Sequence, residues 1–259
     1  MRTPIVAAMC LASAVAQAEI HTQTLTYQGA DGTSLQGYYA YDDSIQGPRP
    51  GVVVVHEWWG LNEYAQQRAR DLAALGYSAL AIDMYGEGKY TDHPKDAMAF
   101  MQAALANAEQ AKQRFEAGLA TLKAQPATDA SKVAAIGYCF GGKVVLDMAR
   151  QSVPLAAVVS FHGSLATTTP AQAGSVKAKV LVAHGELDSM VPAEQIQAFK
   201  QEMQAAGADY EFLNLPDAKH GFSNPAADSH QAHGLDLAYS QSADETSWAK
   251  MQALFKEVF

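Results

Sequence analysis

The sequence predicts an α/β protein with a mostly parallel central sheet, helices on both faces of that sheet and an antiparallel hairpin at one edge. Two observations carry this prediction. Short continuous apolar runs, typical of strands that are buried on both faces, alternate along the chain with longer segments of helical periodicity. The 259 residues are 49% hydrophobic and 17% charged, which fits one globular domain with a sizeable core.

The predicted elements follow one another in a regular order. Residues 21–27 and 35–41 alternate apolar and polar side chains around turn residues at 29–32, which indicates a β-hairpin. The continuous apolar runs come after Pro50 and cover residues 51–56, 78–82, 133–137, 156–161, 180–183 and 210–215. The predicted helices cover residues 62–75, 94–106, 107–124 and 192–206, with one more starting at 141 and one ending at 259. The longest irregular segments, 167–174 and 224–243, either shape a pocket or lie on the surface.

The first 18 residues have the pattern of a signal peptide. Arg2 precedes an apolar run over residues 4–15, and Ala16-Gln17-Ala18 forms a small-residue cleavage site. We therefore expect residues 19–259 to form one mature domain that is periplasmic or secreted. A membrane anchor needs ~20 apolar residues, and this run is shorter, so we expect no stable membrane association.

Cysteine content and charge narrow the function further. Cleavage after Ala18 removes Cys10 and leaves Cys139 as the one cysteine of the mature chain. Such a thiol is either a small buried hydrophobe or a reactive group. Without Arg2, 17 basic residues stand against 27 acidic ones, a net charge of −10, and no basic cluster occurs. Nucleic acid is therefore not an expected partner.

Cys139 lies in a motif that carries chemistry. The run at 133–137 leads into Gly137-Tyr138-Cys139-Phe140-Gly141, and a helical pattern follows. Gly-x-Cys-x-Gly between a strand and a helix is typical of the nucleophile turn of the α/β-hydrolase fold, where larger flanking side chains would collide. The N-terminus of the following helix would stabilise a thiolate. The alternative is a tight turn with a buried cysteine.

A nucleophile needs a base, and the base needs a group that orients it. In this fold they follow in the order nucleophile, acid, histidine, and Asp188 and His220 come in that order after predicted strands. Asp188 could instead cap the helix that follows, and His162 and His184 could be core or supporting histidines. No metal-ligand spacing links the histidines, and we expect neither a metal nor a cofactor.

The segment after the first buried strand supplies the remaining candidates. The fold takes one oxyanion-hole amide from this loop and one from the residue after the nucleophile, so Trp58 and Phe140 are the predicted donors. Glu57 stands at the same strand end, where a carboxylate is costly to bury unless it is paired. It is therefore either a functional group or one half of a salt bridge.

Together these residues resemble the dienelactone hydrolase family, whose members are carboxymethylenebutenolidase-like. The resemblance covers nearly the whole mature chain and rests on the motifs His56-Glu57-Trp58-Trp59-Gly60, Asp83-Met84-Tyr85, Gly137 to Gly142, Gly185 to Asp188 with Val191-Pro192, and His220-Gly221-Phe222. It implies that Cys139 attacks a small ester or lactone with Asp188 and His220 as partners, and that Glu57 touches the resting thiol and helps to activate it. We expect Trp59, Tyr85 and Phe222 to line the substrate pocket.

The chain departs from the family at two positions. The resemblance implies arginines that bind a substrate carboxylate, and here Glu87 and Asn224 occupy those positions. Neither can clamp a carboxylate, so the dienelactone substrate does not carry over. Two alternatives to an esterase stay open. One is a non-catalytic ligand-binding protein on the same fold, and the other is a thioesterase or peptidase with the same triad.

Overall fold

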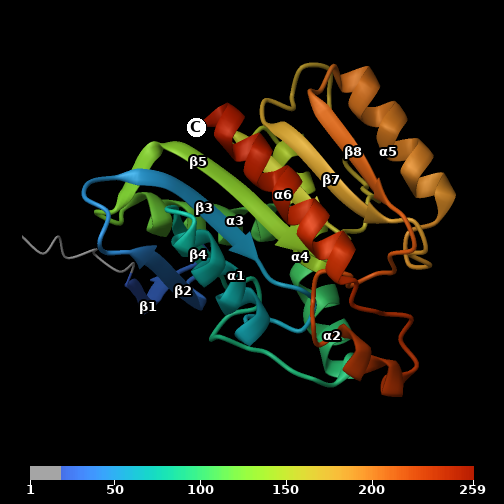
Figure 1. The fold of residues 1–259 in the computed structure, drawn as a ribbon, viewed down its shortest axis with the longest axis horizontal. Helices are drawn as coiled ribbons and strands as arrows, with labels where there is room; N and C mark the ends of the chain where they lie inside the picture. The colour runs from blue at the N-terminus through green and yellow to red at the C-terminus, as the bar shows by residue number, and fades with distance from the viewer. Residues whose placement is uncertain (1–18) are drawn as a thin grey trace, which may run out of the picture.

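The computed structural model describes residues 19–259, and the predicted signal peptide, residues 1–18, lies outside the described residues. Eight strands form one sheet in the order β1-β2-β4-β3-β5-β6-β7-β8 (Figure 1). The strands are β1 (Ile20–Gln28), β2 (Ser34–Asp42), β3 (Arg49–Val55), β4 (Ser78–Ile82), β5 (Thr128–Tyr138), β6 (Ala157–Phe161), β7 (Lys179–Gly185) and β8 (Tyr210–Leu215). Strand β2 pairs antiparallel with β1 and β4, and the other pairs are parallel. The predicted fold class, with its hairpin at one edge, is confirmed.

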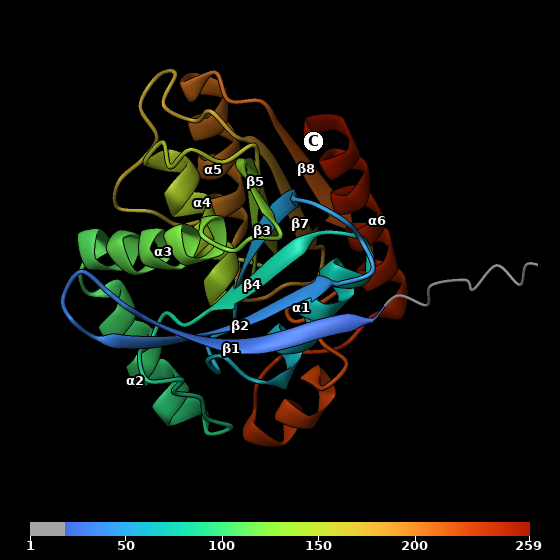
Figure 2. The ribbon, with the colours of Figure 1, turned by 90° about the vertical axis from the view of Figure 1, so that its left-hand side faces the viewer.

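The helices lie in two layers on opposite faces of the sheet. They are α1 (Glu63–Ala74), α2 (Pro94–Leu105), α3 (Ala108–Lys123), α4 (Phe140–Arg150), α5 (Ala193–Ala206) and α6 (Gln241–Val258), with a 3₁₀ helix, η1 (Ala227–His233). Figure 2 shows α1 and α6 on one side of the sheet and α2, α3, α4 and α5 on the other. Because both faces are covered, the central parallel strands can be apolar on both sides.

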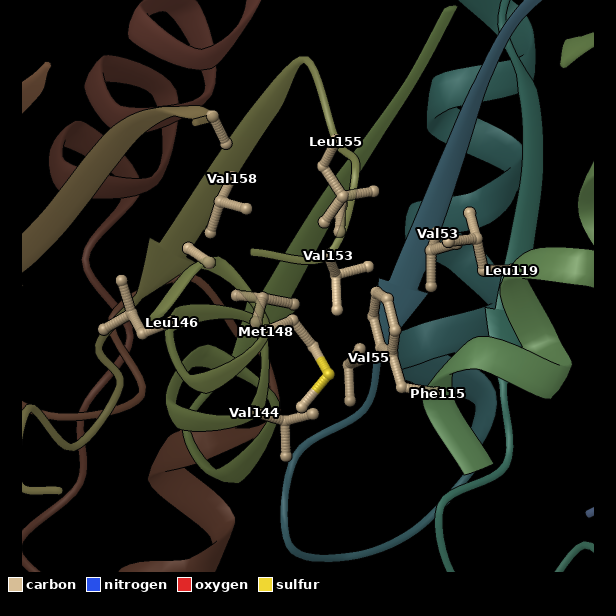
Figure 3. Packing of buried hydrophobic residues seen from close by; sticks show 14 of the residues in the cluster. Val53, Val55, Phe115, Leu119, Val144, Leu146, Met148, Val153, Leu155 and Val158 are labelled. Atoms are coloured by element: carbon tan, nitrogen blue, oxygen red, sulfur yellow. The ribbon is translucent and has the colours of Figure 1, made fainter. Parts of the chain in front are cut away.

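The side chains on the two faces of each central strand pack into two separate hydrophobic cores. Val53 and Val55 of β3 pack with α3 and α4, and Val52 and Val54 pack with α1 and α6. In Figure 3, Val55 lies among side chains of α3 and α4, including Phe115. The run of valines in this strand is thus explained by burial on both sides.

The structure extends some predicted elements for identifiable reasons. Strand β5 starts at Thr128, five residues before its apolar part, because its polar beginning pairs with Arg49 and Pro50 across an irregularity in β3. Helix α6 starts at Gln241, where the Ser240 hydroxyl accepts a hydrogen bond from the Ala243 N–H. The segment 224–243, predicted to be irregular, contains η1.

The topology gathers the candidate residues at one edge of the sheet. Strands β3, β5, β7 and β8 are parallel, so their carboxyl ends lie together, and sites in such sheets form at that edge. Glu57 follows β3, Cys139 follows β5, Asp188 follows β7 and His220 follows β8. None of the helices within residues 19–259 is both long and apolar enough to cross a bilayer.

Candidate active site

The turn between β5 and α4 holds Cys139 in a strained conformation. Its backbone has φ 52° and ψ −112°, a region that residues with a side chain rarely adopt. A Cβ on Gly137 would lie 2.1 Å from the Gly141 carbonyl oxygen, and one on Gly141 would lie 2.3 Å from that of Val55. Both glycines are required for this turn, which places the half-buried thiol at the top of the sheet.

An imidazole–carboxylate pair lies at the same edge. His220 Nδ1–H donates a hydrogen bond of 2.8 Å to Asp188 Oδ2, and Asp188 Oδ1 accepts one of 2.9 Å from the Met190 N–H. Helix α5 has Pro192 at its N-cap with no side-chain cap, so Asp188 is not a helix cap. The carboxylate instead fixes the orientation and tautomer of the His220 ring.

His220 is arranged to accept a proton on its free nitrogen. Burial alone would lower its pKa, but the neighbouring Cys139 and Asp188 outweigh burial and hold the pKa well above the usual 6.5. Its buried Nε2 has no hydrogen-bond partner among residues 19–259. Cys139 and His220 line one cavity, and catalytic hydrogen bonds often tighten only when substrate is bound.

Glu57 is paired with an amide rather than with a cation. Asn224 Nδ2–H donates a hydrogen bond of 2.7 Å to Glu57 Oε2, and Asn224 Oδ1 accepts one from the Ala226 N–H, which fixes the orientation of its side-chain amide. Burial raises the pKa of Glu57 from 4.5 to about 7, although the Asn224 hydrogen bond and the charge of His220 lower it. The carboxyl therefore changes charge near neutral pH, and the salt-bridge interpretation of Glu57 is wrong.

The two residues predicted to supply oxyanion-hole amides, Trp58 and Phe140, both line the cavity with Cys139. Phe140 is the first residue of α4, so its N–H has no acceptor inside the helix. Trp58 follows Glu57 in the turn after β3, and its carbonyl accepts a hydrogen bond of 3.0 Å from the Tyr85 hydroxyl. Tyr85 therefore holds the peptide chain around Trp58.

The cavity, which we call the site cavity, has a volume of about 270 Å³ and mostly apolar walls. It is lined by Glu57, Trp58, Trp59, Met98, Met101, Leu105, Cys139, Phe140, Lys143, Ser164, Met190, Val191, His220, Leu235 and Leu237. No arginine is among these residues, and the one lysine is paired, because Lys143 Nζ donates to Asp147 Oδ2 and to the Ala166 carbonyl oxygen, both at 2.8 Å. Such a lining suits a neutral, apolar ligand.

The predicted pocket residues have three different positions. Trp59 lines the site cavity and stacks on His230, with ring centroids 4.1 Å apart. Tyr85 lies behind the wall, because its hydroxyl is bound to the Trp58 carbonyl and its ring packs on Phe140. Phe222 is fully buried in the core on the α1 and α6 side. The expectation that Tyr85 and Phe222 line the pocket is therefore wrong.

Most of the apolar wall could not be predicted from the sequence. Met98, Met101 and Leu105 follow the spacing i, i+3, i+7 on α2, which places them on one face of the helix. That pattern predicts a buried face but not that the face opens onto the thiol. Glu87, at one position where the family arginine was expected, has an exposed side chain 3.7 Å from Lys89 Nζ and does not line the cavity.

His162 and His184 support the site without lining it. His162 is fully buried, its Nε2 shares a hydrogen bond of 2.8 Å with the Ser223 hydroxyl, and its ring lies 5.1 Å from that of His220. Burial lowers the pKa of both His162 and His184. Within residues 19–259, no group of three or more His, Cys, Asp and Glu side chains could hold a metal ion.

The fold and the arrangement of the site together indicate the class of enzyme. A strained thiol and an imidazole–carboxylate pair lie at the edge of a mostly parallel sheet where α/β-hydrolases carry their active sites. An α/β-hydrolase from a Medee basin deep-sea metagenome library shares the fold, with a TM-score of 0.65 at 20% identity over 92% of this chain and 97% of that chain.

Residues 35–259 match the dienelactone hydrolase family, and the chain belongs to it. A dienelactone hydrolase-like promiscuous phosphotriesterase from metagenomic libraries is 39% identical, with a TM-score of 0.87 over 94% of this chain and 100% of that chain. A protein of Escherichia coli O157:H7, named provisionally as a carboxymethylenebutenolidase, is 27% identical over 88% of this chain and 84% of its own length. The resemblance recognised from the motifs is thereby confirmed, and the protein is a hydrolase of this family.

Proposed function

We propose that the protein hydrolyses small neutral esters or lactones through a thioester on Cys139. The observation that carries the proposal is that Cys139, His220 and Glu57 line one apolar cavity with the two candidate oxyanion amides. A binding protein would not need a strained thiol beside an oriented imidazole, which is why we favour catalysis over ligand binding.

In the proposed first half-reaction, Cys139 Sγ attacks the carbonyl carbon and its proton passes to His220 Nε2, which has no other partner among the described residues. The Trp58 and Phe140 amides would stabilise the oxyanion, each by about 3 kcal/mol. The carbon–oxygen bond then breaks, and the leaving alkoxide takes the proton from His220. In the second half, His220 takes a proton from water, which hydrolyses the thioester and regenerates the thiol.

Glu57 is proposed to assist the thiol. It lines the cavity with Cys139 and its pKa is about 7, so its carboxylate can polarise the S–H bond before substrate binds, and the proton itself passes to His220 when the sulfur attacks. Asn224 holds one oxygen of this carboxyl and leaves the other without that constraint. Asn224 stands at a position where the resemblance implies an arginine, but it is neutral and its amide is already bonded to Glu57. It therefore offers no positive charge to a substrate carboxylate, which supports a neutral substrate.

The test is hydrolysis of p-nitrophenyl acetate by the purified protein. We expect turnover by the wild type, and its loss in Cys139→Ala and after alkylation of the thiol. His220→Ala should lose turnover in parallel, whereas Cys10→Ala should not change it. Unchanged turnover in Cys139→Ala would refute the proposal.

A second candidate activity is hydrolysis of neutral phosphotriesters. It is supported by the 39% identical relative described as a promiscuous phosphotriesterase and by the mostly apolar walls of the site cavity. Diethyl p-nitrophenyl phosphate is a suitable probe, and release of p-nitrophenol that depends on Cys139 would support this activity. Its absence at high enzyme concentration would exclude this triester as a substrate.

We also propose that the mature protein, residues 19–259, acts outside the cytoplasm. The signal-peptide pattern of residues 1–18 supports this location. Expression of the full chain in a bacterial host, followed by fractionation and N-terminal sequencing, tests it. A product in the periplasmic fraction or medium that begins at Glu19 is expected, and an uncleaved cytoplasmic product would contradict the proposal.

A further inference from the structure

A second cavity adjoins the site cavity and has a volume of about 270 Å³. It is lined by Leu105, Ala108, Ala111, Lys143, Val144, Asp147, Met148, Gln151, Ala166, Thr167, Thr168 and Thr169. Leu105 and Lys143 line both cavities. Side chains that face two neighbouring cavities form the wall between them, so the separation depends on these two residues.

The two wall residues are held in different ways. Lys143 is fixed by its hydrogen bonds to Asp147 and to the Ala166 carbonyl oxygen, both 2.8 Å long. Leu105 is the last residue of α2, half-buried at the corner between α2 and α3, and it is held by apolar packing. Leu105 is therefore the part of the wall that depends on side-chain size and not on hydrogen bonds.

The second cavity presents no unpaired charge among the residues that line it. Asp147 accepts hydrogen bonds from Lys143 Nζ at 2.8 Å and from Arg150 Nη1 at 2.9 Å. Figure 3 shows Val144 and Met148 of α4 among the apolar core side chains, and both also line the second cavity. A neutral aliphatic group can enter such a space without leaving a buried charge unpaired.

We propose that Leu105 is a specificity-determining residue that ends the site cavity and so limits the length of the aliphatic group in a neutral ester substrate. The second cavity is the space that a longer group reaches once this side chain is shortened. The proposal rests on the proposed esterase function. Each methylene that gains a buried position should raise kcat/KM by about fourfold.

The experiment compares the chain-length preference of matched variants. kcat/KM is measured for p-nitrophenyl esters from acetate to dodecanoate and, by proton release, for acetates of alcohols of increasing length. The readout is kcat/KM for each ester divided by that for the shortest ester of its series. Leu105→Ala should raise this ratio for longer esters by about 15-fold in one series, as two newly buried methylenes would. Leu105→Phe should shorten the preferred length.

Two further variants separate this proposal from a general loosening of the site. Leu235→Ala removes the same atoms from a wall of the site cavity that the second cavity does not share, so it should not give this gain. Thr167→Trp, made in the Leu105→Ala background, fills the second cavity and should cancel the gain. Thermal unfolding of each variant shows that it is folded.

The outcomes distinguish the two proposals. If the wild type hydrolyses esters and Leu105→Ala leaves both chain-length profiles unchanged, or if Leu235→Ala gives the same gain, the role of Leu105 is wrong and the proposed function stands. If the wild type hydrolyses no ester of either series, the proposed function itself fails. A gain in Leu105→Ala that Thr167→Trp removes supports the role of Leu105.

Discussion

Replacing Glu57 with glutamine should stabilise the protein while impairing its chemistry. The Glu57 side chain is buried, and its one hydrogen-bonding partner among the described residues is Asn224, a neutral amide. Glutamine has the same shape and keeps an oxygen that can accept this hydrogen bond, so the substitution removes mainly the charge. Active sites commonly retain such destabilising groups because function requires them.

The size of the effect follows from the pKa. Burial raises the pKa of Glu57 from 4.5 to about 7, so the folded state holds this proton over a pH range in which the unfolded chain releases it. Below pH 4.5 the carboxyl is neutral in both the folded and the unfolded state, so Glu57→Gln gains no stability over the wild type. Between pH 4.5 and 7 the gain in the free energy of unfolding should grow, and above pH 7 it should level off at about 3 kcal/mol.

Urea unfolding of the wild type and Glu57→Gln between pH 4.5 and 8.5 measures this gain. Glu245→Gln is the matched control, because Glu245 is exposed at the surface of α6, and it should give no comparable gain. A difference between wild type and Glu57→Gln that stays constant with pH, or that grows towards low pH, would refute the argument that the buried carboxylate destabilises the fold.

Three further predictions concern the same site. Asn224→Leu removes the donor that lowers the pKa of Glu57, so the acidic limb of the kcat/KM profile should move upward by about one pH unit, and an unmoved limb would exclude this coupling. Gly137→Ala should lower the melting temperature far more than Gly207→Ala, because the added Cβ meets the Gly141 carbonyl at one position, whereas at Gly207 it meets open space and the cost is only that of the left-handed backbone, about 1 kcal/mol; equal losses would contradict the tight turn. A neutral ester should be hydrolysed faster than its counterpart with a free carboxylate, since no arginine lines the site cavity, and a preference for the anion would show that the cavity has been misassigned.

The order of elements could be read from the sequence because burial leaves a strong pattern. Strands such as β4 (Ser78–Ile82) are continuous apolar runs, and the structure keeps the predicted bounds. The observed bounds differ from the predicted ones where local contacts outweigh hydrophobicity, as at the polar start of β5 and at the Ser240 cap of α6. Apolar periodicity carries no information about either contact.

The site could be predicted only in part for a similar reason. Cys139, Asp188 and His220 follow strands in a fixed chain order, so the topology alone brings them together. Phe222 belongs to a matched motif, but the chain turns its ring into the core, which adjacency to His220 cannot reveal. The partner of Glu57 was equally hidden, because Asn224 lies 167 positions further along the chain.

The central claim, that hydrolysis passes through an acyl group on Cys139, is tested most directly by mass spectrometry. The mature protein is mixed with p-nitrophenyl acetate, quenched within the first turnover and digested. We expect one acetyl group on the peptide that contains Cys139, which accumulates until p-nitrophenol release reaches its steady rate and disappears once the ester is exhausted, and none in Cys139→Ala. Steady hydrolysis with no acyl group on Cys139, or with the acyl group on another residue, would contradict the account.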